Sequence, residues 1–227
     1  MEATADRPEE SFVVRLRRQR MLPLFTCDRV VDALDLLRAL HAGGIRIVEF
    51  TNRTGVAVEV FRDFVKAAAE QLPAMTLGAG TIVGRGQAEA FHAAGAKFIV
   101  APNLDDDVGR VCAERGLPWC PGTGTVSEMI RAHQQGAALI KVFPADALGG
   151  PTFVKAVRGP CPWLKLMPSG GVTLEEANLR AWFAAGVHCV GIGSALIDRE
   201  TLAAGRFSDL ADRTRRLVSL LAEVAPA

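Results

Sequence analysis

Residues 30–50 begin with Val30-Val-Asp-Ala-Leu-Asp-Leu-Leu-Arg-Ala-Leu40, continue through Gly43-Gly44 and end with Ile45-Arg-Ile-Val-Glu-Phe50. In the first segment apolar residues recur three and four positions apart, a spacing that predicts an amphipathic helix. Glycine directly after such a segment is typical of a left-handed helix C-cap. The short, β-branched run that follows predicts a buried strand. The stretch therefore predicts one helix-to-strand step of an α/β fold.

Short apolar runs of the same kind recur along the whole chain, with amphipathic stretches between them. Eight runs predict strands: Met21–Phe25, Ile45–Phe50, Met75–Gly80, Phe98–Val100, Pro118–Cys120, Leu139–Val142, Leu164–Met167 and His188–Ile192. Their separation of roughly 20–30 residues is the length of one βα unit in an eightfold parallel barrel. We therefore predict a (β/α)8 TIM barrel, and an open, doubly wound sheet is the alternative that this pattern also allows.

Two helices are predicted outside the barrel units. An Arg-rich helix over Ser11–Gln19 belongs to an N-terminal extension of residues 1–20, and a helix over Ser208–Val224 lies in the C-terminal segment 200–227. The sequence contains no linker or low-complexity tract, and 227 residues leave little room for a second domain beside eight units. We expect one barrel domain spanning residues 1–227.

The composition is that of a folded globular protein, with 49% hydrophobic and 22% charged residues. Lys plus Arg number 26 and Asp plus Glu number 25, so no excess positive charge favours nucleic acid. No apolar run approaches the roughly 20 residues that span a bilayer, and the N-terminus lacks a secretory apolar region. We expect a cytoplasmic protein without nucleic-acid or membrane partners.

Cysteine and histidine do not cluster in the sequence. The five cysteines contain no Cys-x-x-Cys pair, and the four histidines show no metal-binding spacing. The glycine-rich stretches Gly78–Gly84 and Gly122–Thr125 match neither the dinucleotide fingerprint nor the phosphate loop of nucleotide-binding proteins. The sequence therefore predicts buried free thiols, no metal site and no nucleotide cofactor.

Lys141 is the one charged residue in the apolar run Ala137-Ala-Leu-Ile-Lys-Val-Phe-Pro-Ala145. A free lysine, with a pKa of about 10.4, is almost entirely ammonium near neutral pH. It attacks a carbonyl carbon only where burial disfavours the charged form. One interpretation of Lys141 is such a nucleophile inside a barrel. The other is a lysine that reaches the barrel mouth or pairs with a carboxylate.

Glu49 and Arg53 are predicted to lie near Lys141, because the chemistry of such barrels lies at the C-terminal ends of the strands. Alternation puts Ile45, Ile47 and Glu49 on one strand face, and Arg53 follows the strand end. Glu49 either moves protons for an imine-forming lysine or only neutralises a nearby cation. Arg53 is either a surface residue or a clamp for a substrate carboxylate.

Two glycine-containing loops follow the last two predicted strands. They contain Ser169-Gly170-Gly171 and Gly193-Ser194. Backbone N–H groups in such loops bind phosphate, and many barrels place a phosphate after strands seven and eight. An ordinary tight turn is the alternative interpretation.

At these residues the sequence resembles the class I aldolases that cleave 2-keto-3-deoxy-6-phosphogluconate (KDPG) and 4-hydroxy-2-oxoglutarate (KHG). The matching elements appear in family order over about residues 20–200: Gly44-Ile-Arg-Ile-Val-Glu49-Phe-Thr-Asn-Arg53-Thr, Gly78-Ala-Gly-Thr81, Ala101-Pro102, Pro121-Gly122-Thr-Gly-Thr125, Ile140-Lys141-Val-Phe143-Pro144-Ala145, Pro168-Ser-Gly-Gly171 and Gly191-Ile-Gly-Ser194. The resemblance implies a (β/α)8 barrel, a homotrimer and no metal.

The resemblance also implies a role for each matching residue. Lys141 would be the Schiff-base lysine and Glu49 the acid and base. The residues implied at the pyruvate end are Arg53, Thr81, Pro102 and Phe143. Those implied to hold the hydroxylated tail and its phosphate are Ser169, Gly170, Gly171, Gly193 and Ser194.

The sequence leaves other functions open beside KDPG and KHG cleavage. Ser169 stands where threonine is common in the family. A serine keeps the hydroxyl and its hydrogen bond to the substrate, but it leaves the stereochemical preference at that substrate carbon open. Cleavage of the galactonate epimer is therefore one alternative. A sugar-phosphate isomerase or epimerase barrel would use the same loops without needing an imine-forming lysine. A barrel that only binds phosphorylated metabolites would bind ligand without turnover. The expected partner is a small keto-acid sugar phosphate substrate, and the KHG alternative is a keto acid without a phosphate.

Overall fold

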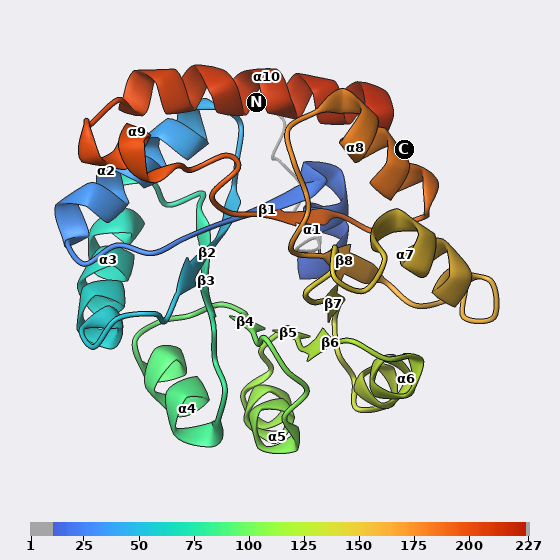
Figure 1. Ribbon diagram of the computed structural model, residues 1–227. Coiled ribbons are helices and arrows are strands. Elements are labelled where there is room, and N and C mark those ends of the chain that lie inside the picture. The colour runs from blue at the N-terminus through green and yellow to red at the C-terminus, as the bar shows by residue number, and fades with distance from the viewer. Residues whose placement is uncertain (1–10, 226–227) are drawn as a thin grey trace, which may run out of the picture.

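The computed structural model describes residues 11–225, so the predicted segment before Ser11 lies outside the described residues. Helices alternate with parallel strands, and Figure 1 shows the helices arranged around the strands. The strands are β1 (Met21–Phe25), β2 (Ile47–Thr51), β3 (Thr76–Gly80), β4 (Ile99–Val100), β5 (Trp119–Cys120), β6 (Gly122–Thr123), β7 (Ile140–Val142), β8 (Leu166–Pro168) and β9 (Val190–Ile192). The helices are α1 (Phe12–Gln19), α2 (Val30–Ala42), α3 (Ala57–Gln71), α4 (Arg85–Ala93), α5 (Asp106–Arg115), α6 (Val126–Gln134), α7 (Gly150–Arg158), α8 (Glu176–Ala184), α9 (Arg199–Ala203) and α10 (Phe207–Val224).

The strands form two parallel sheets. A curled sheet of six strands has the order β5-β4-β3-β2-β1-β9, and a sheet of three has the order β6-β7-β8. A parallel bridge between Ser169 and Gly191 links the sheets, and the His188 N–H donates to the Leu166 carbonyl at 2.8 Å. Because neighbouring strands run parallel, their C-terminal ends lie at the same edge, where polar loop residues can meet.

The described residues contain nine strands, where the sequence predicted eight. The predicted strand Pro118–Cys120 corresponds to β5, and β6 follows it after Pro121 without having been predicted. Proline has no N–H to donate to a neighbouring strand, which explains an interruption at this residue. The Pro121 carbonyl still accepts a hydrogen bond from the Lys141 N–H at 2.9 Å. The predicted bounds of β1 were confirmed at both ends.

The start of β2 also corrects the predicted strand face. The strand begins at Ile47, and the N–H of Ile45 donates instead to the Leu40 carbonyl in α2. Ile45 therefore packs with the residues of the main core, whereas Ile47 belongs to a separate buried cluster. Gly44 adopts a φ of 102°, as the predicted helix C-cap requires.

The separate cluster consists of buried residues from the strands of both sheets and from the segments next to them. Its buried members are Leu16, Leu22, Ile47, Phe98, Val100, Cys120, Leu139, Met167 and Cys189. Helix α1 contributes Leu16 and also Phe12, whose ring centroid lies 4.7 Å from that of Phe98. The predicted N-terminal helix is therefore present and packs against this cluster.

Gln19 fastens α1 to the first residues of two strands. Its side-chain amide donates to the carbonyls of Met21 and Ile47, both at 2.8 Å. Its amide oxygen accepts from the N–H groups of Arg46 and Ile47, at 2.7 and 2.9 Å. Helix α1 thus covers the N-terminal ends of the strands and leaves their C-terminal ends for the site.

Candidate active site

Strand alternation buries the two residues predicted to carry the chemistry. Lys141 lies two residues after Leu139 and Glu49 two residues after Ile47, and both apolar residues belong to the cluster between the strands. The exposed fraction is 1% for Glu49 and 7% for Lys141. A lysine that reaches out of the mouth into solvent is therefore not what the structure contains.

The Glu49 carboxyl group occupies space that a glycine in the next strand leaves free. Glu49 pairs in register with Gly78, and a Cβ atom on Gly80 would lie 1.7 Å from Glu49 Oε1. Within residues 11–225, Glu49 Oε2 accepts no hydrogen bond. Burial raises the pKa of Glu49 above its ordinary value of 4.5, while the charges of Lys141 and Arg53 act in the opposite direction. A carboxyl group with a raised pKa holds a proton more readily than an ordinary carboxylate, which suits a group that exchanges protons.

Lys141 is the middle residue of β7, which lies between two other strands. Its backbone pairs in register with Gly122 on one side and Met167 on the other. The Thr123 hydroxyl donates to the Lys141 carbonyl at 3.2 Å. The Lys141 Nζ lies 5.0 Å from the centroid of the Phe143 ring, a cation–π distance. The backbone is thus fixed, and the amine lies beside an aromatic ring that is 38% exposed.

A cavity of about 630 Å³ opens at the C-terminal ends of β1, β2, β8 and β9. Its lining consists of Leu24, Phe25, Thr26, Arg53, Thr54, Phe143, Ser169, Gly170, Gly171, Val172, Gly191, Gly193, Ser194, Ala195, Ile197, Arg199 and Leu202. The structure therefore brings seven predicted site residues to one cavity: Arg53, Phe143, Ser169, Gly170, Gly171, Gly193 and Ser194. Lys141 and Glu49 do not line the cavity themselves. The Lys141 Nζ lies beside the ring of Phe143, and the charge of Arg53 acts on Glu49, and both Phe143 and Arg53 line the cavity.

Thr81 and Pro102 follow β3 and β4 but do not line this cavity. Thr81 adopts a φ of 61°, in the left-handed region that β-branched residues rarely enter. Its neighbours hold it there, since the Asn52 N–H donates to the Gly80 carbonyl at 2.8 Å and the Ile82 N–H to the Val100 carbonyl. Such strain persists only where the surroundings impose it, as they often do at functional sites.

Sequence reasoning assigned no role to three polar residues of the cavity, Thr26, Thr54 and Arg199. The Thr26 hydroxyl hydrogen-bonds the buried Thr51 hydroxyl, which joins the ends of β1 and β2. Thr26 directly follows a predicted strand, so the rule used for Arg53 would have found it. Arg199 lies in α9, a helix of five residues that was not predicted.

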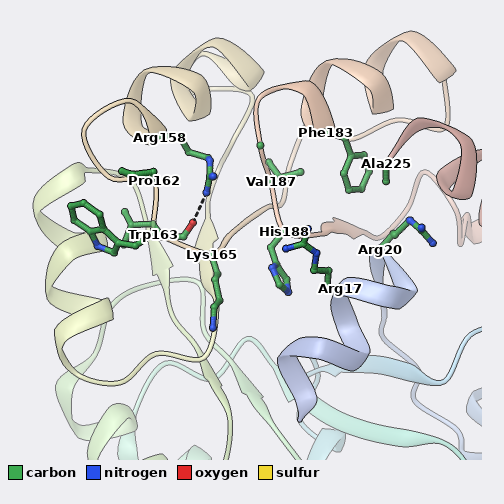
Figure 2. Close-up of a pocket in the computed structure, with 12 residues that line it drawn as sticks. Arg17, Arg20, Arg158, Pro162, Trp163, Lys165, Phe183, Val187, His188 and Ala225 are labelled. Atoms are coloured by element: carbon green, nitrogen blue, oxygen red, sulfur yellow. Dashed lines mark hydrogen bonds between the residues drawn. The ribbon is translucent and has the colours of Figure 1, made fainter. Parts of the chain in front are cut away.

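A second cavity of about 390 Å³ lies at the opposite ends of the strands (Figure 2). Arg20, Lys165 and His188, which precede β1, β8 and β9, line it together with other basic and apolar side chains. The Arg158 guanidinium beside it donates to the Leu164 carbonyl at 2.9 Å. None of the predicted site residues lines this cavity, so it is separate from the chemistry at the C-terminal ends.

The cysteines are buried and unpaired, as the sequence predicted. The five cysteines are buried and free: Cys27, Cys112, Cys120, Cys161 and Cys189. Within the described residues, no three His, Cys, Asp or Glu side chains form a group able to hold a metal ion.

Across residues 11–225, no helix combines the length and apolar character needed to cross a bilayer.

A buried amine beside a buried carboxyl group, next to an arginine-lined cavity, is the kind of site that carbon–carbon lyases acting through an imine use. Residues 13–212 match the family described as "Aldolase: KDPG and KHG aldolase". The chain belongs to this family of aldolases.

Individual relatives agree with the family assignment. A 2-dehydro-3-deoxy-phosphogluconate aldolase of Treponema pallidum is 36% identical over 209 residues, which are 91% of this chain and 97% of that protein. A KHG/KDPG aldolase of Escherichia coli K12 is 33% identical over 199 residues, which are 87% and 90%. A crystal structure of KDPG aldolase from Legionella pneumophila, with pyruvate captured as a covalent carbinolamine intermediate, has a TM-score of 0.82 at 29% identity. The match covers 90% of this chain and 97% of that chain.

Proposed function

We propose that this protein is a class I aldolase that cleaves KDPG to pyruvate and glyceraldehyde 3-phosphate, and that it also cleaves KHG to pyruvate and glyoxylate. The observation that carries the proposal is the burial of Lys141 together with Glu49 beside the cavity at the strand ends. The family assignment and the named substrates of the relatives support the same substrate class.

The proposed reaction begins with the Lys141 amine. It attacks the C2 ketone, water leaves, and a protonated imine forms. Glu49, directly or through a water, removes the proton of the C4 hydroxyl. The C3–C4 bond then breaks, its electrons pass into the imine to form an enamine, and the aldehyde departs. Protonation of the enamine at C3 and attack of water on the resulting imine release pyruvate and regenerate the amine.

The residues around this pair have binding roles in the proposal. Arg53 binds the C1 carboxylate, since a guanidinium forms two parallel hydrogen bonds with it. Phe143 packs over the pyruvate moiety, and Thr81 and Pro102 complete that end. The tail and its phosphate contact the loops at the far side of the cavity: Ser169, Gly170, Gly171, Gly193 and Ser194. The reaction as written needs no metal or cofactor.

Borohydride reduction in the presence of pyruvate tests the central step. The reagent reduces an imine to a stable amine, so the wild-type protein should gain the mass of one reduced pyruvate at Lys141. Lys141→Ala should gain none, whereas Lys165→Ala, which changes an exposed lysine at the opposite ends of the strands, should react normally. An unmodified wild-type protein would overturn the proposal.

Cleavage of the galactonate epimer is a second candidate, and Ser169 is the residue on which it depends. Ser169 is buried to 8% exposure at the cavity, where its hydroxyl can meet the substrate tail. A chain similar over 90% of this one, with a TM-score of 0.79, is described as "Native KDPGal structure". Steady-state rates on KDPG, KHG and the galactonate epimer would rank the three substrates directly.

The finer architecture is also a proposal. We infer that the two sheets close into one eight-stranded barrel, with β5 and β6 as a single strand interrupted at Pro121, and that the chain forms one domain. The bridge from Ser169 to Gly191 supports closure on the other side. A homotrimer in the cytoplasm is the expected assembly and location. Sedimentation equilibrium and fractionation of cells test these two expectations.

A further inference from the structure

Arg199 lies in the cavity but has no role in the proposed reaction. It is the first residue of α9 and lines the cavity with Gly193 and Ser194. Among the described residues that line the cavity, Arg53 and Arg199 are the only charged ones, and no carboxylate is present. Asp146 packs against Gly170 and Gly171 without lining the cavity. The cavity therefore carries two positive charges and suits a ligand with more than one negative charge.

The acidic neighbours of Arg199 are bound to other arginines. The Asp198 carboxylate accepts a hydrogen bond from Arg213 at 2.6 Å, and Glu200 accepts one from Arg206 at 2.9 Å. Within residues 11–225, no ion pair or hydrogen bond engages the side chain of Arg199. Its guanidinium donors are thus available to a ligand, although two carboxylates lie next to it in the sequence.

The backbone that carries Arg199 is held firmly. The Asp198 carboxylate accepts from the Thr201 N–H at 2.7 Å and from the Thr201 hydroxyl at 2.8 Å. Arg213, on α10, also donates to the Thr201 hydroxyl at 2.9 Å. This network ties the first turn of α9 to α10, so Arg199 begins from a fixed point beside the cavity.

The two arginines reach the cavity from different strands. Arg53 follows β2, Arg199 follows β9, and β1 lies between these strands in the sheet. Strand spacing in a sheet is about 4.8 Å, so the two strand ends are about 10 Å apart. A substrate with an anion at each end can contact both arginines, which a substrate with one anionic end cannot do.

We propose that Arg199 is a specificity-determining residue that binds the terminal phosphate monoester of the substrate, at the end remote from the ketone. This inference rests on the proposed function, in which Arg53 binds the carboxylate end. Charge-assisted hydrogen bonds from Arg199 to the phosphate give the enzyme a strong preference for phosphorylated keto acids over keto acids with an uncharged tail. The Gly193–Ser194 loop then supplies backbone contacts, and Arg199 supplies the charge.

The test compares kcat/KM on KDPG with kcat/KM on unphosphorylated 2-keto-3-deoxygluconate. Arg199→Gln should lower the value for KDPG by about 10- to 100-fold. It should change the value for the unphosphorylated acid by less than about threefold. Arg199→Lys, which keeps the charge, should recover part of the loss. Arg62→Gln, a change at an exposed arginine of α3 outside the cavity, should leave both values unchanged.

Pyruvate trapping separates failure of this inference from failure of the proposed function. Pyruvate has no phosphate, so Arg199→Gln should be modified by borohydride and pyruvate as fully as the wild type. Equal losses on both substrates, or no loss on either, would overturn the role of Arg199 while trapping still succeeds. Failure of trapping in the wild type would instead overturn the imine mechanism on which the inference rests.

Discussion

Gly80 makes room for Glu49: a Cβ atom at position 80 would lie 1.7 Å from Glu49 Oε1 and 2.4 Å from Glu49 Cδ. Both residues are in neighbouring strands of the curled sheet, and both are buried. The carboxyl group therefore has its place because the adjacent strand lacks one side chain.

Gly80→Ala is expected to displace the Glu49 carboxyl group and to lower kcat on KDPG by about 10²-fold or more, the scale of a lost proton-transfer group. Steady-state kinetics with circular dichroism as a folding check would measure this effect. Gly84→Ala is the matched control, since no atom lies within 4 Å of its added Cβ and its φ of −173° is ordinary extended backbone. Equal activity in the two variants would contradict the role given to this contact.

Glu49→Gln is expected to change the pH dependence of stability. Burial raises the pKa of Glu49 above 4.5, so the folded state favours the protonated carboxyl group. The stability that the protonated Glu49 carboxyl group contributes is present below the pKa of the unfolded state, and it is lost as pH rises through the higher pKa of the folded state. The Tm of Glu49→Gln minus that of the wild type should therefore increase as pH rises above 4.5. A difference that stays constant or decreases over this range would contradict the cause assigned here.

Gly171→Ala is expected to raise KM for KDPG about tenfold or more while pyruvate trapping persists. Gly171 has a φ of 70°, and an added Cβ would lie 2.4 Å from the Asp146 Cβ, so the loop must shift. Gly205→Ala controls for backbone strain alone, because its φ is 62° and nothing lies within 4 Å of the added Cβ. Similar kinetics of the two variants would argue against a binding role for the Gly170–Gly171 loop.

Gln19→Ala is expected to lower the free energy of unfolding by about 2–4 kcal/mol, because four hydrogen bonds to backbone groups are lost. The activity of each folded molecule should remain, since Gln19 lies at the opposite ends of the strands from the site. Denaturant unfolding measures the change. Gln135→Ala, which removes one bond between exposed side chains, should cost far less. A similar loss in both variants would contradict the role assigned to Gln19.

Local patterns in the sequence predicted where several residues of the candidate site lie. The face shared by Leu139 and Lys141 follows from alternation along a strand, and both side chains lie where this alternation requires. The same rule failed at Ile45, because the N–H of that residue bonds to the preceding helix and the strand begins later. Alternation gives the face of a residue only after the first residue of the strand is known.

Long-range packing decided the features that no local pattern contained. Gly80 was recognised as part of a motif, but its contact with Glu49 depends on the register of two strands. Arg199 reaches the cavity because Asp198 and Arg213 hold α9 against α10, across a separation of 15 residues in the chain.

The alternation of helices and strands, apart from β6 and α9, and the type of residue at each strand end were determined by the sequence alone, since hydrophobic periodicity is a property of neighbouring residues. Only the tertiary structure decided which strands are adjacent, how two sheets are linked through Ser169 and Gly191, and which side chains share a cavity. The physical reason is that burial, strand register and charge pairing join residues far apart in the chain. Their free energies depend on the whole packed arrangement and not on any one segment.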